Sequence, residues 1–263
     1  VPGSTSSLAA EKAAGRDVRM VYSPLDALSL AHDNPGSEVI FMGVGFETTT
    51  PTIAAAILEA QAQSLRNFSV FCAHKTTPPA LRAIAGDPHT HIDGFILPGH
   101  VSTITGIEPY RFLVDEFRIP GVITGFEPVD VLEGIAVLVN MVERDEPAIQ
   151  NAYRRGVDTK GNAVARALVN QVFEPCDAIW RGLGPIPQSG LRIRDDFAAF
   201  DATRRFEVEV EQTVEPQGCR CGDVLRGRIA PTQCPLFGRK CAPEDPVGPC
   251  MVSSEGSCAA YFR

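Results

Sequence analysis

The sequence predicts an α/β protein with two Rossmann-like lobes, built on mostly parallel sheets, and a loop-rich segment at the C-terminal end. Three observations support this prediction. Short apolar runs alternate with helical stretches between Val18 and Glu143, as they do in right-handed βαβ units. Turns rich in glycine and proline separate these elements. Six of the eight cysteines fall between Cys219 and Cys258, where large apolar residues become scarce.

The elements alternate in the order that a parallel sheet requires. Five apolar runs predict strands buried on both faces, at Val18–Tyr22, Val39–Val44, Ser69–Cys72, Gly94–Leu97 and Gly121–Thr124. Helices are predicted between and after them, at Leu25–His32, Pro51–Ala62, Ala80–Ala85, Pro109–Phe117 and Val129–Val142. Alternating apolar and polar residues at 206–214 predict a further strand. The expected domains are 1–75 and 76–200 for the lobes and 201–263 for the C-terminal segment.

Composition and charge restrict the function. A chain of 263 residues with 44% hydrophobic residues can bury a large core. Its net charge of −8 disfavours nucleic acid as a partner, because phosphate binding needs a basic face. No membrane segment and no signal peptide are recognisable, so we expect a cytoplasmic protein with reduced thiols. The chain opens on Val1 rather than Met, and we expect it to be part of a longer protein.

Three loops after predicted strands carry polar residues suited to a binding cleft. The first contains Gly45, Glu47 and Thr48, and the helix start after it would offer N–H groups to an anion. The loop does not match the dinucleotide-binding fingerprint, because Thr48 occupies the position of the third glycine. The other loops place His100 and Glu127 after later strands. Since ligands bind at the carboxyl ends of strands, the loops are expected to converge at one sheet edge. An ordinary capped strand–helix junction and a loop histidine bonded to backbone remain alternatives.

Other polar residues point to structural roles. His89 and His91 have a spacing found in metal sites but lie in a loop without cysteines, which disfavours metal binding there. Cys72 ends an apolar run and is expected in the core. Cys176 and Trp180 lie in a stretch that looks helical, and their side chains are expected to pack.

Metal or sulfur chemistry must hold the cysteine-rich segment, because it has too few apolar residues for a core of its own. Its cysteines are Cys219, Cys221, Cys234, Cys241, Cys250 and Cys258. A zinc site usually uses C-x2-C pairs, which this segment lacks. A set of disulfides needs an oxidising compartment. An iron–sulfur cluster takes four thiolates and leaves two cysteines for a redox pair. The C-R-C motif at 219–221 favours this third alternative.

Several motifs identify a family resemblance. They are G-F-E-T-T at 45–49, P-G-H-V-S-T-I at 98–104, G-F-E-P at 125–128, W-R-G-L-G-P-I-P-Q-S-G-L at 180–191 and C-R-C-G-D-V-L-R-G at 219–227, together with the tail that begins C-P-L-F-G-R-K-C at 234. These motifs resemble the HypD family of [NiFe]-hydrogenase maturation factors. The resemblance extends over the whole chain and implies two α/β lobes with a third part that carries a [4Fe–4S] cluster.

The resemblance implies a scaffold more than a turnover enzyme. With the small chaperone HypC, family members hold an iron atom while two cyanides and one carbon monoxide are attached to it. HypE supplies the cyanide, and the finished group passes to the hydrogenase large subunit. The family also carries an N-terminal part with a further cysteine and a G-P-G-C-P-V-C motif. That part is absent from this sequence, and we expect it to lie upstream in the full protein.

The resemblance also implies roles for individual residues. Four cysteines would be cluster ligands: Cys219, Cys234, Cys241 and Cys258. Cys221 and Cys250 would form a redox-active pair beside the cluster. Glu255 and His100 match family motif positions and are the best candidates outside the cysteines.

We expect the cluster and the cysteine pair to relay electrons toward the cleft edged by Gly45, His100 and Glu127. One alternative is an iron–sulfur thiol–disulfide reductase, which would turn over alone with an electron donor. Another is a structural metal module on a sugar- or nucleotide-binding protein. That module would bind zinc and tolerate loss of Cys221 and Cys250.

Overall fold

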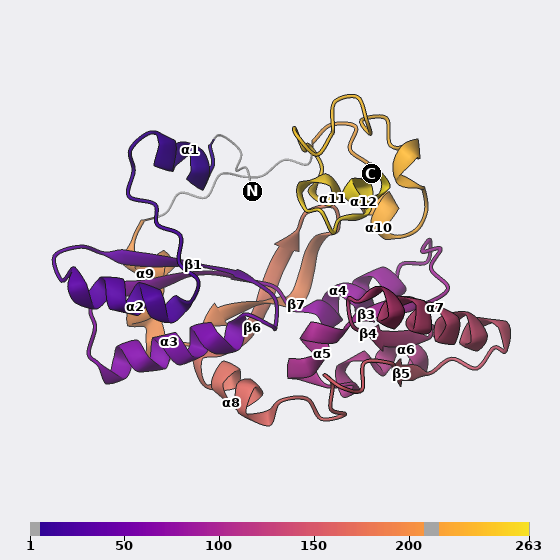
Figure 1. The fold of residues 1–263 in the computed structure, drawn as a ribbon, viewed down its shortest axis with the longest axis horizontal. Helices are drawn as coiled ribbons and strands as arrows, with labels where there is room; N and C mark the ends of the chain where they lie inside the picture. Colours follow the sequence, from indigo (N-terminus) through magenta and orange to yellow (C-terminus); the bar gives the residue numbers. More distant parts are fainter. Residues whose placement is uncertain (1–5, 208–215, 263) are drawn as a thin grey trace.

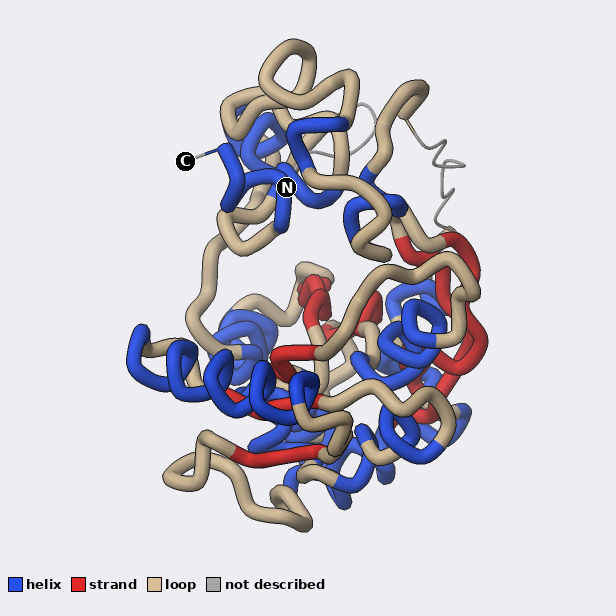
Figure 2. The backbone as a smooth tube through the Cα atoms, turned by 90° about the vertical axis from the view of Figure 1, so that its right-hand side faces the viewer, coloured by secondary structure: helices blue, strands red, loops and turns tan. Residues whose placement is uncertain are grey.

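The protein consists of two α/β lobes, a long antiparallel hairpin between them and a cysteine-rich module beyond the tip of the hairpin (Figure 1). The computed structural model describes residues 6–207 and 216–262. Figure 2 shows the module at one end of the molecule, stacked on the lobes. Both lobes are built on parallel strands, so the predicted α/β class with mostly parallel sheets is confirmed.

The first lobe is a pair of parallel strands packed against helices. The prediction that the strand at 39–44 is buried on both faces is wrong, because Ile40, Met42 and Val44 are exposed. Its strands are β1 (Val39–Gly45) and β2 (Phe68–His74), and its helices are α1 (Leu8–Ala13), α2 (Pro24–Asp33) and α3 (Thr50–Ala62). A capping box starts α2, because Asp26 accepts a hydrogen bond from the Ser23 N–H. The core between the strands and helices includes Ile57, Phe68 and Val70, all fully buried.

The second lobe has three parallel strands in the order β3-β4-β5. The strands are β3 (Phe95–Pro98), β4 (Gly121–Thr124) and β5 (Ile149–Asn151). Its helical elements are α4 (Thr77–Ala85), α5 (Gly99–Thr105), η1 (Glu108–Tyr110), α6 (Phe112–Asp115) and α7 (Pro128–Glu143). Every residue of β4 is buried, as expected for the central strand of a parallel sheet. Leu97, Tyr110 and Ile123 are fully buried in the core of this lobe.

The hairpin returns to the first lobe and projects beyond it. After α8 (Ala163–Val172) come β6 (Phe173–Trp180), β7 (Gly184–Ile193), η2 (Asp195–Phe200) and α9 (Ala202–Arg205). The prediction that Cys176 and Trp180 lie in a helix is wrong, because both belong to β6. Burial alternates residue by residue along β6, and a register shift between Cys176 and Ala178 interrupts its pairing with β7. The sequence does not show the alternation of burial, because Glu174 lies among the less exposed residues and Ile179 is 70% exposed.

Two further local predictions differ from the structure. Val18–Tyr22 is not a strand, and Met20 and Tyr22 are 75% and 92% exposed. An apolar run forms a strand only where its backbone pairs with another strand. This run lines one pocket with β1 but pairs with no strand among the described residues. The helix predicted at Pro109–Phe117 is divided into η1 and α6. The strand predicted at 206–214 falls mainly on residues 208–215, which lie outside the described residues.

The module consists of short helical turns joined by loops. These are α10 (Cys221–Leu225), η3 (Pro231–Gln233), α11 (Pro249–Val252) and α12 (Ser257–Phe262). The buried cluster inside it contains four cysteines together with Val224, Met251 and Ala259. None of the helices within the described ranges is long and apolar enough to cross a membrane.

The division into domains 1–75, 76–200 and 201–263 stays a prediction. The three buried clusters follow it with one difference. Val172, Phe173, Ile193 and Phe200 belong to the cluster of the first lobe, although they lie in the range predicted for the second. The chain therefore leaves the first lobe after β2 and returns to it at α8.

Candidate functional site

All six cysteines of the module line one small pocket. Its lining residues are Cys219, Cys221, Cys234, Leu236, Phe237, Cys241, Gly248, Cys250, Met251 and Cys258. Cys221, Cys250 and Cys258 lie on helices of only four to six residues, too short to be stable by themselves, and the other three lie in loops. The contacts around the sulfur atoms must therefore hold this part of the chain in place.

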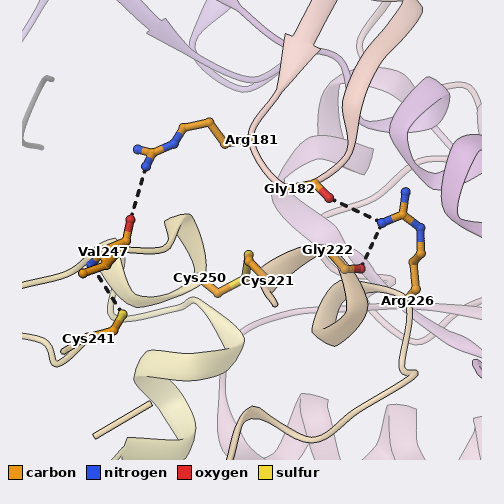
Figure 3. Close-up of a disulfide and its surroundings, with 8 residues drawn as sticks. All are labelled: Arg181, Gly182, Cys221, Gly222, Arg226, Cys241, Val247 and Cys250. Atoms are coloured by element: carbon orange, nitrogen blue, oxygen red, sulfur yellow. Dashed lines mark hydrogen bonds between the residues drawn. A yellow bond between two sulfur atoms is a disulfide. The ribbon is translucent and has the colours of Figure 1, made fainter. Parts of the chain in front are cut away.

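Cys221 and Cys250 are joined by a disulfide (Figure 3). Their Cα atoms are 6.2 Å apart, and their sequence separation is 29. The two residues are 3% and 6% exposed. A Cβ atom at Gly256 would lie 2.2 Å from the Cys250 carbonyl oxygen, so the backbone closes tightly over this end of the disulfide.

The other four cysteines of the module surround the same pocket as neighbours of one another. Burial, followed by the neighbouring Cys234, Cys241 and Cys219, raises the pKa of the Cys258 thiol to about 11. In the part of the chain that is described, no three His, Cys, Asp or Glu side chains converge closely enough to hold one metal ion. A [4Fe–4S] cluster makes a different demand, because each of its irons takes one thiolate. Four thiols spread around one apolar pocket meet that demand.

The backbone at residues 247–248 approaches two of these sulfurs. The Val247 N–H donates a hydrogen bond to Cys241 Sγ at 3.4 Å. A Cβ atom at Gly248 would lie 2.7 Å from Cys219 Sγ, so a glycine is required there. Hydrogen bonds to ligating sulfurs are one means by which a protein tunes a cluster.

The tip of the hairpin contacts the disulfide side of the module (Figure 3). A Cβ atom at Gly182 would lie 3.4 Å from Cys221 Sγ, which is ordinary contact distance. Arg226 donates a hydrogen bond to the Gly182 carbonyl at 3.4 Å, and Arg181 donates one to the Val247 carbonyl at 3.3 Å. The hairpin therefore links the module directly to the lobes.

The first predicted cleft loop lies beside the hairpin, where the Phe46 ring centroid is 6.1 Å from that of Trp180 near the tip. Gly45 has a φ of +151°, and a Cβ atom there would lie 2.3 Å from Thr49 Oγ1, so only glycine fits. Its carbonyl accepts a hydrogen bond from the Lys75 N–H at 3.0 Å. Next along the chain, Thr76 donates from its N–H to the Ser189 carbonyl of β7 at 2.9 Å.

Glu47 and Thr48 of the same loop have different surroundings. The Glu47 carboxylate accepts hydrogen bonds from the N–H and the hydroxyl of Thr77, at 2.7 and 3.0 Å. It therefore caps the start of α4, and its burial raises the pKa of the Glu47 carboxyl. Thr48 is exposed. The structure thus gives Glu47 a structural contact beyond the cleft role predicted for it.

The second and third loops lie together, because β3 and β4 are parallel neighbours. His100 is exposed in α5, and its ring centroid is 4.7 Å from that of Phe126 and 6.3 Å from that of Tyr153. Glu127 is exposed and lies 3.6 Å from the Arg155 guanidinium. The loop at Gly45 follows a strand of another sheet. The prediction that all three loops share one sheet edge is therefore wrong.

Two remaining predictions concern Glu255 and Cys72. Glu255 is exposed in the turn between α11 and α12, one residue before the glycine that closes over Cys250. Cys72 packs against the core of the first lobe, as expected, and its thiol donates to the Leu191 carbonyl at 3.1 Å. Burial raises the pKa of Cys72 to about 11.

Sequence reasoning missed one interaction in this region. Asp130 is buried, and the Arg155 guanidinium donates to both of its oxygens at 2.7 and 2.5 Å. This contact holds the pKa of Asp130 below its usual value. Arg155 also lies over the Tyr153 ring, 4.7 Å from its centroid. The motif N-A-Y-R-R-G-V at 151–157 contains an aromatic residue and two arginines after a strand, and these arginines were the sequence feature that could have indicated a buried ion pair.

Comparisons with known proteins agree with these features. A family model described as "HypD: Hydrogenase formation hypA family" matches residues 1–263. The chain is 50% identical over 268 residues to the hydrogenase maturation factor HypD of Rhodobacter capsulatus, covering all of this chain and 71% of that protein. It is 45% identical over 266 residues to HypD of Escherichia coli (strain K12), again covering all of this chain and 71% of the relative. The chain therefore belongs to the HypD family of hydrogenase maturation factors.

Proposed function

We propose that the protein is an assembly scaffold for the Fe(CN)2CO group of [NiFe]-hydrogenase, and that its cysteine module supplies electrons during assembly. One observation carries this proposal. Four cysteine thiols and the disulfide line one pocket, and the hairpin that contacts this disulfide runs back to the loop at Gly45. Thiols beside a disulfide can supply electrons to an assembly reaction, which a site that only binds the assembling group would not need.

Cys219, Cys234, Cys241 and Cys258 would hold a [4Fe–4S] cluster. When bound there, the cluster supplies one-electron transfer at a potential that burial and hydrogen bonds to sulfur adjust. The residues around it exclude water, since Leu236, Phe237 and Met251 line the same pocket. The N–H of Val247 is placed to stabilise a thiolate at Cys241.

Cys221 and Cys250 would accept electrons as a pair. Two electrons and two protons convert their disulfide into two thiols, and loss of the same electrons and protons restores it. The thiols could then reduce another disulfide or keep the cargo iron in the required oxidation state. His100 and Glu127, exposed at neighbouring strand ends, are the proposed contacts for the assembling group.

The proposed partners follow from the same function. A HypC-like chaperone would share the iron atom, a HypE-like protein would deliver cyanide, and the hydrogenase large subunit would receive the finished group. The proposal places the protein in the cytoplasm, where a disulfide can be reduced and reformed. The iron with its cyanide and carbon monoxide ligands is the cargo in this scheme.

Substitution of the disulfide cysteines tests the proposal. Cys221→Ser and Cys250→Ser should keep the visible absorbance of the cluster after anaerobic purification, yet yield no mature hydrogenase in a host that lacks its own HypD. Cys176→Ser is the matched control, because Cys176 lies in β6 outside the pocket, and it should mature hydrogenase normally. Full maturation by both disulfide variants would refute the electron-supply role.

A self-standing thiol–disulfide reductase is the second candidate, since a disulfide beside a cluster site suits that activity as well. Its substrate would need to reach the sulfur atoms of Cys221 and Cys250, two residues that are only 3% and 6% exposed. This burial favours the scaffold. Turnover of a small disulfide substrate by the protein alone, with dithionite as electron donor, would favour the reductase.

A further inference from the structure

One carboxylate of the second lobe holds the cysteine module. Asp87 follows α4, and both of its oxygens accept hydrogen bonds from Arg228 Nη2, at 2.7 and 2.8 Å. Arg226 Nε lies 2.7 Å from the same carboxylate, as an ion pair whose N–H is not directed at the oxygen. The Asp87 side chain is only 17% exposed. A single acidic residue thus joins the lobe to two arginines of the module.

Backbone contacts reinforce this junction. The N–H of His91 and the hydroxyl of Thr90 donate to the Arg226 carbonyl, at 2.9 and 3.2 Å. Arg228 Nε donates to the His89 carbonyl at 3.1 Å. Gly227 has a φ of +68°, and a Cβ atom there would lie 2.6 Å from the His91 carbonyl oxygen. His89 and His91 therefore contribute main-chain groups to an interface between the lobe and the module.

One helix connects the junction to the loop at Gly45. α4 has nine residues, and Glu47 of the first cleft loop caps its start at Thr77. Asp87 comes two residues after its end at Ala85. The loop at Gly45 and the module therefore attach to opposite ends of the same short helix.

Arg226 also connects the junction to the disulfide. It pairs with Asp87 on one side and donates to the Gly182 carbonyl at the hairpin tip on the other. Gly182 in turn lies against Cys221 Sγ. A Cβ atom at Gly222 would lie 2.2 Å from the Gly182 carbonyl oxygen, so the tip and α10 are in the closest contact their residues permit.

We infer that Asp87 is a positioning residue that locks the module onto the hairpin tip and so shields the Cys221–Cys250 disulfide from thiols in solution. While the junction is closed, the hairpin tip covers the Cys221 side of the disulfide. Opening the junction frees Arg226 from Asp87 and loosens its hold on the Gly182 carbonyl, which leaves the tip attached through the Arg181–Val247 hydrogen bond. This inference concerns the disulfide alone and holds whether or not the proposed maturation role is correct.

The reaction that the closed junction slows is ordinary thiol–disulfide exchange. A thiolate of dithiothreitol attacks one Sγ, forms a mixed disulfide with it and releases the other cysteine as a thiolate. The second dithiothreitol thiol then displaces the bound cysteine, which leaves two cysteine thiols and cyclic oxidised dithiothreitol. Attack requires approach along the S–S axis, so the rate reports how often the junction opens.

Reduction kinetics of the whole chain test the inference. The anaerobically purified protein is mixed with dithiothreitol, and alkylation of Cys221 and Cys250 is followed by mass spectrometry. Asp87→Asn should speed reduction on the order of tenfold or more, since a charge-assisted hydrogen-bonded contact is lost. The wild-type rate should also rise with salt, because salt weakens the ion pairs, whereas the Asp87→Asn rate should not change.

A second variant tests the shielding without removing a charge. Gly222→Ala should separate the hairpin tip from α10 and speed reduction as well. The controls are Asp145→Asn, whose carboxylate is exposed and pairs with Arg118, and Gly36→Ala, where a Cβ atom meets nothing within 4 Å. Both controls should react at the wild-type rate. Wild-type rates in Gly222→Ala, or in a folded Asp87→Asn protein, would overturn the inference.

Discussion

The lobes and the cysteine module differ in the interactions that stabilise each of them internally. The first lobe buries Ile57, Phe68 and Val70 completely between strands and helices, and apolar burial of this kind stabilises a domain on its own. The module has turns of helix only three to six residues long, and cysteines form much of its buried cluster. Hydrophobic burial thus shapes the lobes, and sulfur chemistry shapes the module.

Because the two regions are stabilised differently, the stability of the lobes and the chemistry of the sulfur centre should be separable by substitution. Changes in the lobe cores should alter the free energy of unfolding without altering the sulfur centre. Changes among the cysteines should alter the module without unfolding the lobes. The predictions that follow test this separation, beginning with the largest effect.

Loss of one proposed cluster ligand should disorder the module. Cys258→Ser removes a thiol that is buried among three others, so the pocket would lose a constraint that its short helices cannot replace. Limited trypsin digestion should then cut within residues 216–262 and leave the lobes intact. Cys176→Ser should be cut like the wild type. Unchanged protection of the module in Cys258→Ser would show that apolar contacts suffice there.

A cavity in the first lobe should have the opposite effect. Ile57 is 0% exposed, and Ile57→Ala should lower the free energy of unfolding by about 2–5 kcal/mol. Urea unfolding measures this change. Iron and sulfide content per folded chain should stay at the wild-type level, and a parallel decrease would mean that the lobe and the module form one cooperative unit.

The Asp130–Arg155 pair should give the second lobe an acid-sensitive contact. Arg155 lowers the pKa of Asp130 below the ordinary value of 3.8. The stability from this pair is therefore present above that value and is lost as the pH falls through the lowered pKa. Arg155→Met should lose stability near about pH 6 and show a shallower decrease toward about pH 3 than the wild type.

Urea midpoints at the two pH values measure this prediction. Arg118→Met is the matched control, since its exposed partner Asp145 makes a single contact at 3.3 Å. Equal pH dependence in Arg155→Met and the wild type would contradict the assignment.

Glu47 should produce the smallest effect, with the opposite sign. Burial raises the pKa of Glu47 above the ordinary value of 4.5. Its favourable contribution is therefore present below that value and is lost as the pH rises through the raised pKa. Glu47→Gln keeps an acceptor for the Thr77 N–H, so it should gain stability relative to the wild type between about pH 4 and about pH 7. A constant difference over this range, measured by urea unfolding, would refute the effect of burial.

The sequence predicted β1 to β4 well because these strands are mostly apolar and are separated by glycine and proline. It did not predict β5, which has three residues, two of them polar. It failed at β6, where Glu174 lies among the less exposed residues and Ile179 is 70% exposed, so that polarity does not follow the alternation of burial. It also failed at Val18–Tyr22, a run that pairs with no strand among the described residues. Spacing alone left the chemistry of the cysteines open among three alternatives. The role of Asp87 could not be predicted, because its partners Arg226 and Arg228 lie far away in the sequence and only the fold brings them together.

Iron and acid-labile sulfide analysis of the anaerobically purified protein, with a visible spectrum, tests the central claim most directly. If sulfur chemistry holds the module through a [4Fe–4S] cluster, the protein should contain about four irons and four sulfides per chain and absorb broadly in the visible. Zinc in place of iron, or metal-free protein with Cys219, Cys234, Cys241 and Cys258 joined in disulfides, would contradict it.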